Sequence, residues 1–140
     1  MDINEILIPE TAIKAIEDGH WVEDIPNAPG LRLRVRGLSS RKVLGLHDLK
    51  IRKASRADKN ADGSLKSEAS LRVTREVYAE AVLLEWDGIT ANGKPVPYSK
   101  ELAKKWLSDR SGDNFMRFVT YAANEVDELQ NETAEALEKN

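Results

Sequence analysis

The sequence lacks cysteine, contains few aromatic residues and has no long apolar run. Because there is no cysteine, a disulfide framework, a thiolate metal site and thiol catalysis are all excluded. No apolar stretch approaches the roughly 20 residues that a helix needs to cross a bilayer, and the acidic start MDINEILIPE does not resemble a secretory signal. The sequence therefore indicates a soluble, intracellular protein without a membrane partner.

Basic residues are scarce near the N-terminus, although the net charge of the chain is only -3. Residues 1–24 carry seven acidic side chains and a single basic one, Lys14. Residues 31–56 carry nine Lys or Arg and one acidic residue, and the stretch 125–138 is acidic again. This acid-base-acid layout could mediate internal docking or head-to-tail self-association between copies.

The length and composition fit one domain with a modest core, since 41% of the 140 residues are hydrophobic and 32% are charged. We expect a single domain over residues 1–140 with an α+β, mostly α fold, in which a small N-terminal β-hairpin packs against four to five helices. Residues 1–38 would form a helix plus the hairpin, and residues 39–140 would form the helical part.

The N-terminal part shows a short helical pattern followed by two extended segments. Pro9 begins the helical pattern and Gly19 ends it, in the positions where these residues are common. Segments 20–25 and 31–36 flank a turn rich in proline, and the second segment alternates apolar and charged residues with period two. This pattern predicts a β-hairpin with one face toward the core (Leu31, Leu33, Val35) and one wet face (Arg32, Arg34, Arg36).

The rest of the chain is predicted to be helical near residues 40–54, 67–86, 99–108 and 113–135. The helix starts are marked by capping residues, namely Ser39 or Ser40, Ser99, and Asp113 or Asn114.

Three segments between or beyond these helices have their own character. Residues 55–66 are polar and predict a mobile loop that contributes nothing to the core. Pro95 and Pro97 predict a rigid extended connection from Gly93 onward. The tail 130–140, where the apolar stripe thins, is either frayed or waiting for a partner.

One segment resembles part of a calcium-binding loop. Residues 58–63 match the first half of an EF-hand, D-x-N-x-D-G, but the twelfth position is Ala69, and Glu68 comes one residue early. Without the bidentate carboxylate a calcium ion lacks much of its oxygen shell. An ordinary Asx-type turn is the favoured interpretation, and no metal site is expected.

Residues suited to catalysis are few. Only His20 and His47 titrate near neutral pH without strong perturbation, and neither belongs to a recognisable constellation. There is no G-x-S-x-G, no H-E-x-x-H and no phosphate-binding glycine loop. We therefore expect no enzyme activity, no catalytic residue and no cofactor.

The stretch from Trp86 to Leu107, WDGITANGKPVPYSKELAKKWL, is the most informative in the chain. A helix is predicted to stop at Trp86, a turn forms at Asn92-Gly93, and a Leu-rich helix restarts at Ser99 after a Gly-Lys-Pro-Val-Pro-Tyr-Ser loop. This run resembles the tail assembly chaperones of long-tailed, non-contractile bacteriophages. Residues 19–22 and 31–38 resemble the same family.

The resemblance implies a protein that binds and solubilises the tape measure protein in the host bacterial cytoplasm during tail assembly. The tail tube protein is a second candidate partner. Client contacts are expected from the aromatic loop and the apolar stripe of the last helix, at Tyr98, Trp106, Phe118, Val126, Leu129 and Leu137. Residues 138–140 can be encoded by a purine-rich slippery run, and members of the family are often made in a second, longer form by frameshifting.

The aromatic residues of the loop also have a purely structural interpretation, which we favour. Trp86, Tyr98 and Trp106 would lock the angle between two helices from inside the core, with Tyr98 the most exposed of the three. The alternative is an exposed aromatic docking patch.

Two alternative functions stay open. The basic segment 32–56 could serve a small nucleic-acid-binding or regulatory protein, since phosphate neutralisation requires clustered Lys and Arg. Nucleic acid is nevertheless not the expected partner, because the hairpin lacks exposed aromatics for base stacking and Trp21 is assigned to the core. The third class is a virion structural protein of the tail or the head-tail joint.

Overall fold

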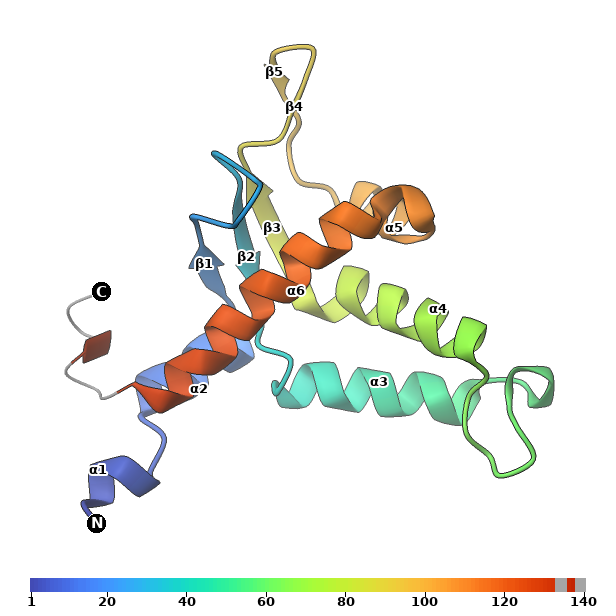
Figure 1. The fold of residues 1–140 in the computed structure, drawn as a ribbon, viewed down its shortest axis with the longest axis horizontal. Coiled ribbons are helices and arrows are strands. Elements are labelled where there is room, and N and C mark those ends of the chain that lie inside the picture. The colour runs from blue at the N-terminus through green and yellow to red at the C-terminus, as the bar shows by residue number, and fades with distance from the viewer. Residues whose placement is uncertain (133–135, 138–140) are drawn as a thin grey trace.

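A three-stranded antiparallel sheet lies at the centre of the fold in the computed structural model, which describes residues 1–132 and 136–137 (Figure 1). Its strands, β1 (His20–Val22), β2 (Arg32–Val35) and β3 (Leu83–Asp87), follow in the order β1-β2-β3. The long helix α6 (Asp113–Glu128) crosses one face of this sheet and contacts β1 and β2. The predicted α+β, mostly α single domain is confirmed.

The predicted hairpin is present, but the predicted helix 67–86 is wrong at its end, over residues 83–86. Helix α4 ends at Val77 (Ser67–Val77), a π-helical turn follows (η2, Tyr78–Val82), and the chain then enters β3. Strand β3 pairs with the free edge of β2, whose backbone donors and acceptors would otherwise lack partners in the sheet. This tertiary pairing overrides the helical pattern of the sequence.

Helix α6 ends at Glu128 and is shorter than the predicted span 113–135, whereas the remaining helices agree closely with the predictions. They are α2 (Glu10–Asp18), α3 (Arg41–Lys53) and α5 (Lys100–Leu107), and a short helix that was not predicted, α1 (Ile3–Ile6), precedes them. Single 3₁₀ turns occupy η1 (Arg56–Asp58), η3 (Arg110–Gly112) and η4 (Leu129–Asn131). No helix in the described part of the chain is both long and apolar enough for a membrane span.

Two of the three predicted helix caps are confirmed. Ser40 caps α3 and Ser99 caps α5, each accepting a hydrogen bond from a backbone N–H of the first turn. The third prediction is wrong, because Gly112 occupies the cap position of α6 and Asp113 is already helical. The Asp113 carboxylate instead pairs with Arg75 from α4, at 2.6 Å.

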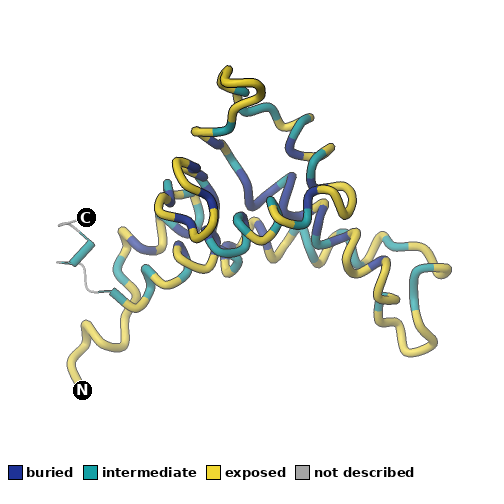
Figure 2. The backbone as a smooth tube through the Cα atoms, turned by 45° about the horizontal axis from the view of Figure 1, so that its top comes forward, coloured by how far each residue is buried: buried dark blue, intermediate teal, exposed yellow. Residues whose placement is uncertain are grey.

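The core lies between the sheet, α6 and the α4–η2 segment (Figure 2). Leu31, Leu33 and Val35 are all buried, as their alternation with arginine predicts. The largest fully buried apolar side chains are Leu33, Leu83, Leu107, Val35, Val82, Val119 and Val126.

The opposite face of β2 is not the open basic surface that the sequence predicts. Arg34 donates to the Asp18 carbonyl at 2.8 Å, and Arg36 donates to the carbonyls of Glu17 and Ala81 at 2.8 and 2.9 Å. These bonds satisfy carbonyls at the end of α2 and in η2 that would otherwise lack partners. The two arginines are therefore structural groups.

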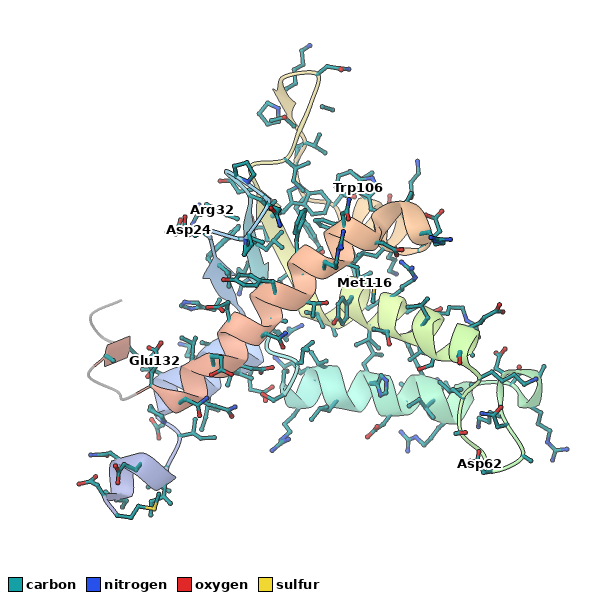
Figure 3. All side chains as sticks on the ribbon, viewed as in Figure 1. Asp24, Arg32, Asp62, Trp106, Met116 and Glu132 are labelled. Carbon is teal, nitrogen blue, oxygen red and sulfur yellow. The ribbon has the colours of Figure 1, made fainter. Side chains whose placement is uncertain are left out.

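Trp21 and Arg32 form the exposed corner of the sheet. The Arg32 guanidinium lies 4.8 Å from the Trp21 ring centroid and also pairs with Glu23 and Asp87 at 3.6 and 3.5 Å. Figure 3 shows Arg32 close to the turn that contains Asp24. Trp21 is only partly buried, so its assignment to the core is corrected.

The loop 55–66 is a polar segment that does reach the core. Asp62, at its tip in Figure 3, accepts hydrogen bonds from the backbone and hydroxyl of Ser64 at 3.0 and 2.6 Å, which is the predicted Asx-type turn. Asp58 pairs with Arg72 at 2.7 Å. Leu65 packs against the core, contrary to the expectation that this loop contributes nothing there.

The proline-rich connection is a small hairpin rather than a plain extended segment. Strands β4 (Thr90–Ala91) and β5 (Lys94–Pro95) pair across the Asn92-Gly93 turn, whose φ angles are 52° and 80°. An Asn-Gly pair with both residues at positive φ is typical of such hairpins.

The predictions for residues 133–135 and 138–140 lie outside the described residues.

Glu17 links α2 to the start of α3 and makes one part of the stability depend on pH. Burial alone would raise the pKa of Glu17, but hydrogen bonds from the Arg41 N–H and the Ser40 hydroxyl outweigh it and lower the pKa below the ordinary 4.5. A carboxylate with a lowered pKa stabilises the fold above its unfolded pKa, and this contribution is lost as the pH falls through the folded pKa.

We therefore expect Glu17→Gln to lower the free energy of unfolding by about 1 kcal/mol at pH 7, with a smaller effect at pH 3. Urea unfolding at both pH values measures the difference. Glu125→Gln on the exposed face of α6 is the control and should change stability at neither pH. An equal loss for Glu17→Gln at pH 3 and pH 7 would show that the charge of Glu17 contributes nothing.

Candidate functional surfaces

The aromatic residues of the Trp86–Leu107 segment form one cluster. Trp86 stacks on Trp106 with ring centroids 4.8 Å apart, and Tyr98 meets Trp86 edge-on at 5.0 Å. Phe115 from α6 closes the cluster against both tryptophans at 5.9 and 5.8 Å. Trp86 is 4% exposed, and its indole N–H donates to the Val96 carbonyl at 2.7 Å.

This cluster agrees with the structural interpretation for Trp86, which is buried, but the ring belongs to strand β3 and does not lie between two helices. It ties β3, the β5–α5 connection, α5 and α6 together around one buried ring. Tyr98 and Trp106 keep only part of their rings accessible (Trp106 is labelled in Figure 3). Burial, with a smaller effect of the Glu85 carboxylate, raises the pKa of the Tyr98 hydroxyl, so this group stays neutral at physiological pH.

Phe118 lies apart from this cluster and lines a hollow of about 440 Å³ between α6 and the β1–β2 turn. The hollow is lined by Ile25, Pro26, Asn27, Asn114, Arg117, Phe118 and Tyr121. Asp24 and Asn27 hold the turn above it with φ angles of 57° and 64°. Such angles are uncommon outside glycine, and Asp and Asn tolerate them best.

The remaining predicted contact residues differ in accessibility. Val126 is only 1% exposed and belongs to the core, where a client could not reach it without opening the fold. Leu129 is half-buried and packs on the same core, and Leu137 is also half-buried. The structure therefore brings Tyr98 and Trp106 together, and it places Phe118 at a separate surface.

Sequence reasoning missed the largest group of exposed apolar side chains, which lies at the N-terminus. In α1, Ile3 and Ile6 are 61% and 62% exposed, Leu7 is 61% exposed, and no residue of this helix is buried. We call residues 1–8 the N-terminal arm, which projects from the body of the protein (Figures 1 and 2). The signal was present in the sequence as INEILI, whose apolar residues had no assigned core position.

A charged cleft separates α4 and α5. Lys50 bridges Glu76 and Glu80 at 3.1 and 2.9 Å, and Lys104 approaches Glu80 at 3.8 Å. The hydrogen bond to Glu80 raises the pKa of Lys50, against the opposing effect of burial. These charges neutralise one another inside the chain. We therefore interpret the cleft as a group of ion pairs that holds α3, the α4–η2 segment and α5 together.

Arg75 is the buried cation of this region, at 7% exposure. Its guanidinium donates to the Asp109 carbonyl at 2.8 Å, to the Leu107 carbonyl at 3.4 Å and to Asp113 at 2.6 Å. Within the described residues, no group of three or more His, Asp or Glu is arranged to hold a metal ion.

The family model described as YdaY prophage protein matches residues 46–140, which is more than half of the chain. The chain therefore belongs to the YdaY prophage protein family. The match begins inside α3 and includes α4, the aromatic cluster and α6. Neither a curated protein nor a solved structure matches the chain.

Proposed function

We propose that this prophage protein is a tail assembly chaperone that binds the tape measure protein and keeps it soluble until the tail tube forms around it. Its prophage family and the resemblance of residues 86–107 to such chaperones support this function. Within that stretch the helix starting after Ser99 is present as expected, whereas the loop contains the β4–β5 hairpin and Trp86 lies on a strand and does not end a helix.

The observation that carries the proposal is the amphipathic hollow beside α6. Phe118 and Tyr121, with Ile25, offer apolar surface, and Arg117 and Asn114 supply polar groups. This combination suits a helix that presents an apolar stripe and a polar flank, as a long helical client does at many places along its length. A shallow contact of this kind is weak singly and gains strength by repetition, so it can be displaced when the tube assembles.

The arginines of β2, together with Arg36 directly after it, weigh against the nucleic-acid alternative. Arg34 and Arg36 donate to backbone carbonyls, and Arg32 pairs with two carboxylates, so their charges face groups of the chain itself. A phosphate-binding face would present such groups to solvent. The alternative of a virion structural protein can be distinguished by analysing finished particles, because a structural protein should be present in them and a chaperone should be absent.

A co-expression pull-down with this protein as tagged bait and the tape measure protein of the same prophage as prey tests the proposal. We expect Asn114→Trp, which fills the hollow from an exposed helix position, to reduce retained client at least about tenfold, or about 1.4 kcal/mol. The matched control is Asn124→Trp, at an exposed position of the same helix outside the hollow. Equal retention by both variants would remove the hollow as the client site.

Duplex DNA at low salt serves as a competing ligand in the same pull-down. Retention of DNA that declines steeply as the salt concentration rises, without retention of the client, would replace the chaperone proposal with the nucleic-acid alternative.

A further inference from the structure

The N-terminal arm carries a preformed apolar face that the rest of its own chain does not cover. Asp2 accepts a hydrogen bond from the Asn4 N–H and Glu5 accepts one from the Asp2 N–H, both at 2.8 Å, which closes a capping box around α1. Ile3, Ile6 and Leu7 then share one side, because residues three and four apart are neighbours on a helix. The arm is thus a short helix with an apolar side and two carboxylates, those of Asp2 and Glu5.

The outward face of α3 has the complementary character. Leu44 and Leu49 are 43% and 36% exposed and flank Gly45. Arg52 and Lys53 stand at the same end of the helix, and no carboxylate among the described residues pairs with either of them. We call the surface formed by Leu44, Gly45, Asp48, Leu49, Arg52 and Lys53 the outer α3 face, in which the two cations outnumber the single carboxylate of Asp48.

Gly45 leaves room for a close approach to this face. A glycine inside a helix is unfavourable compared with alanine, but its missing side chain lets another backbone come near. Inside this chain nothing requires it, since a Cβ added to Gly45 would have no heavy atom within 4 Å. Gly45, Asp48, Ile51 and Arg52 line a shallow hollow of about 370 Å³ that faces outward.

We propose that two copies of this chain associate by exchanging N-terminal arms, with the arm of each copy seated on the outer α3 face of the other. The apolar side of α1 would cover Leu44, Gly45 and Leu49, and the carboxylates of the arm would face Arg52 and Lys53. One short arm buries little surface area. We therefore propose the reciprocal arrangement, in which two-fold symmetry makes the same contact twice and leaves no arm or face of the dimer unoccupied.

This association does not depend on the proposed chaperone function, because neither surface includes the hollow beside α6. The charge pairing makes it sensitive to salt, since exposed charges are screened more strongly as ionic strength rises. A protein that binds tape measure protein but is monomeric would overturn only the arm exchange, and a dimer that ignores the client would overturn only the chaperone proposal.

Sedimentation equilibrium of the full chain provides the test. We expect a dimer at low salt whose Kd rises at least tenfold at high salt. Gly45→Gln places a side chain in the contact while favouring the helix, so it should raise the melting temperature of the monomer and weaken the dimer at least tenfold. Ser70→Gln, on the exposed side of α4, is the matched control and should leave the dimer unchanged.

A mixing experiment identifies the two halves of the contact. Ile6→Ser removes apolar surface from the N-terminal arm, and Gly45→Gln blocks the outer α3 face. Each variant alone should be monomeric. Their mixture retains one of the two contacts, between the arm of the Gly45→Gln chain and the face of the Ile6→Ser chain, so we expect it to associate more weakly than the wild type and more tightly than either variant alone. A monomeric wild type, a Gly45→Gln dimer as tight as the wild type, or a mixture that associates no more tightly than either variant alone would each overturn the proposal.

Discussion

Trp86→Ala is expected to lower the free energy of unfolding by about 4 kcal/mol, which is a large part of the stability of a domain of this size. The substitution leaves a cavity at the centre of the aromatic cluster, where Trp106, Tyr98 and Phe115 all contact the Trp86 ring. It also leaves the Val96 carbonyl without the indole N–H that now donates to it at 2.7 Å.

Urea unfolding followed by circular dichroism measures this loss without relying on tryptophan fluorescence. Trp21→Ala is the control, because Trp21 is partly exposed and contacts the Arg32 side chain at the surface, and we expect it to cost no more than about 1 kcal/mol. Trp86→Phe should fall between the two. If both alanine variants lost the same small amount of stability, the cluster would not be the packing centre of this half of the fold.

Gly112→Ala should be the most damaging glycine substitution near α6, with an expected loss of about 3 kcal/mol. A Cβ at Gly112 would overlap the carbonyl group of Trp106 and crowd the Cα of Leu107. This backbone cannot retreat easily, because Arg75 donates hydrogen bonds to the carbonyls of Leu107 and Asp109 in the same segment.

The same substitution at Gly45 is the matched control and should have the opposite sign. An added Cβ there meets no neighbouring atom, and alanine is the better helix former, so Gly45→Ala should stabilise the monomer by up to about 1 kcal/mol. Thermal unfolding at low protein concentration measures both variants. A Gly112→Ala protein as stable as the wild type would mean that α5 and α6 do not approach each other as closely as described.

The parts of the fold that the sequence predicts are those set by local rules. Period-two alternation places Leu33 and Val35 in the core, and serine caps mark the starts of α3 and α5. The Asn92-Gly93 turn is likewise visible before the structure is known. Each of these features depends on residues close together in the chain.

The parts that the sequence does not predict depend on distant partners. Residues 83–87 continue an apolar helical pattern, and only the free edge of β2 explains why they form β3. From the sequence, Arg75 would be assigned to the exposed face of a helix. Only the fold places the carbonyl groups that follow α5 within hydrogen-bonding distance of its guanidinium. Arg34 and Arg36 look like part of an exposed basic face in the sequence, because the carbonyl groups that they contact, in α2 and η2, are distant along the chain.

The candidate site shows the same division. The apolar stripe of α6 includes Phe118, which lines the hollow, but the stripe cannot distinguish Val126, which faces inward, from a residue at the surface. Ile25 and Pro26 complete the hollow from a turn almost 90 residues earlier, a juxtaposition that no local pattern contains. The N-terminal arm was overlooked because a four-residue helix is too short to show periodicity.

The solubility of the tape measure protein tests the chaperone proposal most directly. The client would be expressed alone, with this protein, and with an unrelated helical protein at the same level, and its share in the supernatant after centrifugation would be measured. The proposal predicts a client that is insoluble alone and with the unrelated protein, and soluble with this one. A client that precipitates equally in all three cases, while this protein stays folded and soluble, would contradict it.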